Sequence, residues 1–108
     1  MVTSRKRTPR SALLDLVEFL CELESRRIHY SLGHRRESSI LVLFAVPGER
    51  WEVEFFADGA VEVEIFGAGS GLFSGATARD AVRGLLETNE PAGAGGVPPD
   101  PLLRPKRP

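Results

Sequence analysis

Four glutamates at alternating positions are the residues of this chain whose type and spacing could do chemistry. Glu52 and Glu54 lie in the run WEVEFF, and Glu62 and Glu64 lie in the run VEVEIF. Paired carboxylates hydrolyse glycosides, and clustered carboxylates bind cations such as iron or calcium. A glycosidase needs a pocket around its carboxylates, whereas a flat sheet face offers none. We therefore interpret the four glutamates as binding residues.

The other reactive side chains form no recognisable site. His29 and His34, the only histidines, are five positions apart and fall on opposite faces of a strand. Cys21 is the only cysteine, which excludes an internal disulfide, and it flanks an apolar helical stripe. The run GAGSGLFSG lacks the spacing of a dinucleotide-binding loop and the lysine of a P-loop. The sequence predicts a protein that is not an enzyme and has no catalytic residue, cofactor or metal ligand set.

The composition indicates one domain between two charged ends. The chain has 108 residues, of which 42% are hydrophobic and 27% are charged. Residues 1–10 carry four basic and no acidic side chains, and residues 91–108 contain six of the eight prolines. Such segments bury too little apolar surface to fold. We predict a flexible basic tail over 1–10, a single α+β domain over 11–90 and a disordered Pro/Gly-rich tail over 91–108.

The charge of the predicted domain limits its partners. Residues 11–90 hold 14 acidic and 7 basic side chains, a balance of −7. This sign disfavours nucleic-acid binding by the core, because a phosphate backbone requires positive charge. No apolar run reaches the ~20 residues of a membrane-spanning helix, and no apolar signal core follows the basic start. We therefore expect a cytoplasmic protein without a membrane partner.

Apolar periodicity predicts a helix on each side of a run of strands. Ser11 is a candidate N-cap for the first helix, which ends near Arg26. Its expected apolar stripe comprises Leu13, Leu16, Val17 and Leu20. The strands are expected at 28–32 and in the runs SSILVLFAV, WEVEFF and VEVEIF, with GAGSGLFSG as a connector to the second helix. The predicted fold is α+β: an N-terminal helix, a four-stranded antiparallel β-meander and a C-terminal helix, with both helices on one face of the sheet.

The hairpin that carries the glutamates has a predictable register. Residues directly opposite each other share a face, so Trp51, Val53 and Phe55 must pair with apolar residues. A three-residue loop, 57–59, with Gly59 in the left-handed region achieves this. It pairs Phe55 with Val61, Val53 with Val63, and Trp51 with Ile65. On the other face, it sets Glu54 against Glu62 and Glu52 against Glu64, where like charges repel slightly.

The outer face of this sheet is the predicted binding surface. If Val42 and Phe44 point inward on the preceding strand, Leu41 and Leu43 point outward, and Phe56 joins them. A contiguous apolar patch bordered by charge is typical of an interaction surface. We predict that a protein partner contacts Glu52, Glu54, Glu62, Glu64, Leu41, Leu43 and Phe56.

The run AVPGERWEVEFFADGAVEVEIF, residues 45–66, resembles the central motif of a family of small, mostly uncharacterised bacterial proteins. The members look like single α+β domains and resemble the immunity partners encoded next to polymorphic toxins. The resemblance covers about residues 40–66, and its motif is a turn, a hairpin and a core tryptophan. It carries no catalytic residue to transfer. It implies a non-enzymatic inhibitor of a toxin domain.

These observations lead to one main hypothesis and two alternatives. The main hypothesis is an immunity-type inhibitor that docks an acidic, partly apolar sheet face on a basic toxin or effector domain, where charge speeds association and apolar side chains hold the complex. The first alternative is a homodimeric structural protein or a specific chaperone that uses the same face. The second alternative is an acidic metal-binding domain.

Overall fold

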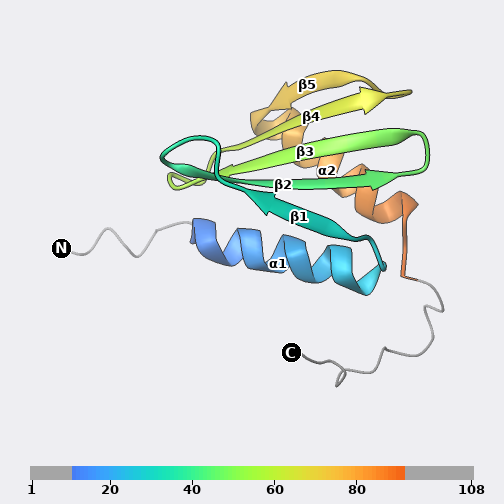
Figure 1. Cartoon of the computed structure of the whole chain (residues 1–108), viewed down its shortest axis with the longest axis horizontal. Helices are drawn as coiled ribbons and strands as arrows, with labels where there is room; N and C mark the ends of the chain where they lie inside the picture. Colours follow the sequence, from blue (N-terminus) through green and yellow to red (C-terminus); the bar gives the residue numbers. More distant parts are fainter. Residues whose placement is uncertain (1–10, 92–108) are drawn as a thin grey trace.

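Residues 11–91, the part of the chain that the computed structural model describes, form a five-stranded sheet with two helices on one of its faces (Figure 1). The predicted tail over 1–10 lies outside the described residues, and so does the predicted tail over 91–108 except for Pro91. The sheet is an antiparallel meander in which sequential strands are neighbours, in the order β1-β2-β3-β4-β5. The elements are α1 (Ala12–Ser25), β1 (Tyr30–Gly33), β2 (Ser39–Val46), β3 (Glu49–Phe56), β4 (Val61–Gly67), β5 (Gly71–Ser74) and α2 (Gly75–Thr88).

The α+β fold, the meander and the position of the helices are confirmed, but the sheet has one more strand than the four predicted. The extra strand, β5, comes from the glycine-rich run that we expected to be a connector. Phe73 pairs with Val63 on the inner face and packs against the core, so this short segment does bury apolar surface. Gly67 has φ 120°, and a Cβ at this position would clash with the carbonyl oxygen of Gly48. The glycines therefore shape the tight turn that precedes β5.

The predicted register of the β3–β4 hairpin is confirmed at every pair. Val53 lies opposite Val63, and Glu54 lies opposite Glu62. Gly59 has φ 94°, the left-handed conformation that the three-residue loop requires. The backbone N–H of Phe56 donates to the carbonyl of Ala60 at 2.9 Å and closes the loop.

The buried face of α1 agrees with the predicted stripe only in part: Leu16 and Leu20 pack against the core, whereas Leu13 and Val17 are exposed. Ser11 is the N-cap, as predicted, and its hydroxyl accepts the Leu14 N–H at 3.1 Å. However, Phe19 and Leu23 are the buried residues of the helix, whereas Leu13 is 67% exposed. The Phe19 ring lies 5.9 Å from that of Phe44 and 5.5 Å from that of Phe55. Burying this large ring turns the helix so that Leu13 and Val17 point away from the core.

The second helix buries one apolar stripe against the sheet. Ala78 and Leu85 are buried, and Ala81, Val82 and Leu86 are partly buried against the same core. Both helices lie on one side of the sheet (Figure 1), where α1 contacts β3 and α2 contacts β4 and β5. The two helices meet where the Arg26 guanidinium donates to the carbonyl of Leu86 at 3.0 Å. Within residues 11–91, neither helix has the length and apolar character needed to cross a bilayer.

Candidate functional site

The candidate site is the outer face of the sheet, which neither helix covers (Figure 1). The strand register brings all seven predicted residues onto it. Leu41, Glu54 and Glu62 form one row across the strands, and Leu43, Glu52 and Glu64 form the next. Phe56 follows on the same side, opposite Ser39. The side chains of this face therefore gather as expected, and their surroundings determine what they can bind.

Glu54 is at the centre of the face and is almost completely buried, with 2% of its surface exposed. Its carboxylate accepts the Ser39 hydroxyl at 2.5 Å. It also lies 3.6 Å from the Arg35 guanidinium and 3.5 Å from that of Arg36. Glu54 is predicted to contact a partner, but in the structure this chain itself supplies the hydrogen bond and the counter-charges of the carboxylate.

Two of the other glutamates are also paired within the chain. Glu52 lies 3.5 Å from Arg35 and 3.7 Å from Arg50, and Glu62 lies 3.8 Å from Arg36. Glu64 forms no ion pair with another described residue, 11–91. Three arginines thus face four glutamates, which leaves a net charge of −1 in place of the unpaired acidic ladder that we expected.

The arginines that sequence reasoning missed come mostly from the loop between β1 and β2. Arg35 and Arg36 lie in this loop, and both remain about half exposed while they contact the glutamates. The Arg36 guanidinium also lies 5.3 Å from the centre of the Phe56 ring. On β3 itself, Arg50 lies 4.2 Å from the centre of the Phe66 ring. The sequence signal for Arg35 and Arg36 is a pair of adjacent basic residues in the short loop before β2, the strand that pairs with β3.

The apolar residues of the face are not equally accessible. Leu41 is 5% exposed and cannot serve as a free anchor. Leu43 and Phe56 are half-buried. Leu72, which was not predicted, pairs with Glu64 from β5 and is 71% exposed. The accessible apolar and acidic groups of the outer face therefore lie toward β4 and β5.

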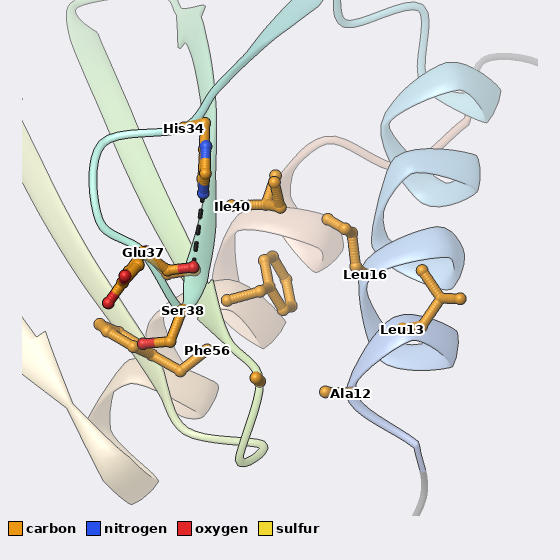
Figure 2. A pocket seen from close by; sticks show the side chains of 11 residues that line it. Ala12, Leu13, Leu16, His34, Glu37, Ser38, Ile40 and Phe56 are labelled. Carbon is orange, nitrogen blue, oxygen red and sulfur yellow. Dashed lines mark hydrogen bonds between the residues drawn. The ribbon is translucent and has the colours of Figure 1, made fainter.

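A small hollow of about 280 Å³ lies at the edge of this region, between the β1–β2 loop and the start of α1. Figure 2 shows Leu16 and Ile40 at the hollow on the α1 side, with Glu37 and Phe56 on the side away from α1. The His34 ring lies 3.5 Å from the carbonyl of Glu37. The lining is largely apolar, and the contact of His34 is with the backbone carbonyl of Glu37.

The remaining reactive groups lie at separate positions of residues 11–91. Cys21 is exposed on α1 and forms no disulfide. Among residues 11–91, no three His, Cys, Asp or Glu side chains are grouped to hold a metal ion. Tyr30 donates to Glu24 at 2.5 Å. Burial, and then this hydrogen bond, raises the pKa of Tyr30 to about 12.

Comparison of the chain with protein-family models, with curated protein sequences and with solved structures finds no match.

Proposed function

We propose that this protein is a non-enzymatic binding domain that docks the open outer face of its sheet on another protein. The observation that carries the proposal is a sheet face without a helix cover whose charged side chains are already held in place. Ion pairs that are ordered before binding lose less conformational entropy in a complex. The contact is centred on the β4–β5 side, where Glu62, Glu64 and Phe66 lie beside the exposed Leu72.

The finer proposal remains an immunity-type inhibitor of a toxin or effector domain. The arginines on this face reduce its attraction for a basic partner. A face with a net charge of −1 steers such a partner only weakly. A partner surface that carries both signs of charge and an apolar centre matches this face better than a uniformly basic cleft. We therefore expect binding with a shallow dependence on salt.

A pair of matched variants tests the proposal. Leu72→Asp combined with Glu64→Lys alters the accessible part of the outer face, and Leu13→Asp alters an equally exposed leucine on α1. A protein captured by the immobilised wild-type chain is purified, and its affinity for each variant is measured by calorimetry. We expect at least a tenfold loss for the outer-face variant and no loss for Leu13→Asp. Equal affinity of all three chains would contradict the proposal.

A homodimer through the same face is the second candidate, and the exposed Leu72 on the edge strand β5 favours it. Light scattering after size-exclusion chromatography distinguishes the two. A dimer that Leu72→Asp dissociates supports self-association, whereas a monomer supports a different partner. Metal binding at Glu54 is disfavoured, because the guanidinium groups of Arg35 and Arg36 occupy the positions beside its carboxylate that a cation would take.

A further inference from the structure

We propose that a hollow on the opposite, helix-covered face binds an aliphatic ammonium group, meaning a short apolar chain that ends in a positively charged amine. The hollow measures about 550 Å³ and lies between the β2–β3 turn and the second half of α2. This volume is within the range of small-ligand sites. The residues that line it include Val46, Pro47, Trp51, Ile65 and Leu85.

Glu49 supplies the negative charge of the hollow. It shares the inner face of β3 with Trp51 and Val53, so it is a carboxylate on the face that otherwise builds the core. One carboxylate oxygen accepts the indole N–H of Trp51 at 2.9 Å. The other oxygen lies against Gly69, which has no side chain to displace it.

The Glu49 carboxylate has no ion-pair partner in the described part of the chain. Within residues 11–91, no lysine, arginine or histidine lies within ion-pair distance, 4.0 Å, of its carboxylate. The neutral indole orients the carboxylate without neutralising it. A half-buried carboxylate beside apolar walls attracts a cation more strongly than one in open water, because the local dielectric is lower.

Gly84 keeps the hollow open. It lies within α2, where glycine is less favourable than alanine, and it lines the hollow. A Cβ at this position would meet no atom within 4 Å, so packing does not require the glycine. The missing side chain leaves the space beside Trp51 free for a ligand.

The lining selects the ligand by charge and by shape. An anion would face the Glu49 carboxylate, and a strongly hydrated metal ion would meet apolar walls. An alkyl chain covers the apolar walls while its ammonium group pairs with the carboxylate. Both a free alkylamine and a lysine side chain of another protein have this chemistry.

Trp51 is the only tryptophan and therefore reports binding directly. Hexylammonium is titrated into the full chain in an amine-free buffer, and Trp51 fluorescence and the indole N–H chemical shift are followed. Hexanol, of the same length but neutral, is the matched ligand control. We expect saturable binding of hexylammonium at least tenfold tighter than that of hexanol. Equal binding of the two, or no saturation, overturns the proposal.

Two variants test the assigned residues. Glu49→Gln keeps an acceptor for the Trp51 indole and removes only the charge, so it should weaken hexylammonium at least tenfold and leave hexanol unchanged. Gly84→Leu should fill the hollow and abolish the binding of both hexylammonium and hexanol. Glu87→Gln, on the exposed side of α2, is the control and should leave the binding of both unchanged. If Gly84→Leu misfolds, Gly84→Met repeats the test with a more flexible side chain. Unchanged affinity in a folded Glu49→Gln variant overturns the assignment.

A second probe distinguishes a free alkylamine from a lysine side chain of another protein. Nα-acetyl-lysine amide carries the same ammonium group with a peptide backbone attached. Binding as tight as that of hexylammonium supports a partner's lysine, and at least tenfold weaker binding supports a free amine. The outer-face variant Leu72→Asp should bind hexylammonium normally, so this result and that of the proposed function can be read separately.

Discussion

Two carboxylates of one strand, β3, lie in different electrostatic surroundings on the two faces of the sheet. Glu49 and Glu54 are five positions apart and therefore point to opposite faces. Glu54, on the open face, is buried under Arg35, Arg36 and the Ser39 hydroxyl. Glu49, on the helix-covered face, has a neutral indole as its partner. The face that the sequence marks as acidic is thus nearly neutralised, and a less conspicuous glutamate keeps its charge available.

The two faces are also stabilised by different forces. The inner face is a packed apolar layer in which Val42, Val53 and Val63 are fully buried. The outer face is covered by guanidinium groups that bridge neighbouring glutamates. On the inner face, the free energy of unfolding should fall when a side chain loses volume. On the outer face, it should fall when a charged group loses its partner. Substitutions that change only volume or only charge test this comparison.

The largest effect is expected on the inner face. Phe19→Ala removes the ring that packs against Phe44 and Phe55, and it should lower the free energy of unfolding by about 3–5 kcal/mol. Leu13→Ala, on the exposed side of the same helix, should change it by less than about 0.5 kcal/mol. Urea unfolding followed by Trp51 fluorescence measures both. Similar losses for the two variants would mean that α1 is rotated relative to the arrangement described.

The next effect separates the two glutamates themselves. Glu54→Gln keeps an acceptor for Ser39 but removes the charge between two arginines, and it should cost about 2 kcal/mol. The cost falls below that of a fully buried ion pair because both arginines are half exposed and can turn to water. Glu49→Gln should change stability by less than about 0.5 kcal/mol, since it removes no counter-charge. Urea titration of the two variants gives the difference, and equal costs would contradict the comparison.

The hairpin could be predicted from sequence because each of its determinants is local. Alternating apolar residues decide which side chains face inward, and Gly59 limits the loop to the length that matches them. The pairing of Glu54 with Glu62 then follows from counting positions. The prediction of two helices on one face is equally direct, since each carries one apolar stripe that only the inner face can cover.

The charge state of the outer face could not be predicted in the same way. Arg35 and Arg36 reach the glutamates because an irregular loop folds over the sheet, and irregular backbone has no periodicity to read. The rotation of α1 depends on one ring, Phe19, that packs against Phe44 of β2 and Phe55 of β3. The strand β5 is short and contains glycine, so its pairing depends on a neighbour strand and not on its own propensity.

A smaller effect tests whether the outer face behaves as a connected network. Arg36 lies near both Glu54 and Glu62, at 3.5 Å and 3.8 Å. A double-mutant cycle of Arg36→Gln with Glu54→Gln should give a coupling of about 0.5–1.5 kcal/mol, because Glu54 is buried. The cycle with Glu62→Gln should give about 0.2–0.5 kcal/mol, since Glu62 is 41% exposed at its side chain. Equal couplings would show that burial does not set the strength of these pairs.

The effect that is smallest at neutral pH concerns a third carboxylate, Glu24 on α1, which contacts Tyr30 on β1. Burial, and then the hydrogen bond to Glu24, raises the pKa of Tyr30 from 10.0 to about 12. The folded state therefore holds this proton more tightly than the unfolded state. The resulting stabilisation is complete below pH 10 and is lost as the pH rises from about 10 to about 12. Because Tyr30 is the only tyrosine, tyrosinate absorbance reports its titration directly. Tyr30→Phe should remove this part of the pH dependence, and a midpoint near 10 in the folded wild-type chain would show that Glu24 does not hold the hydroxyl in solution.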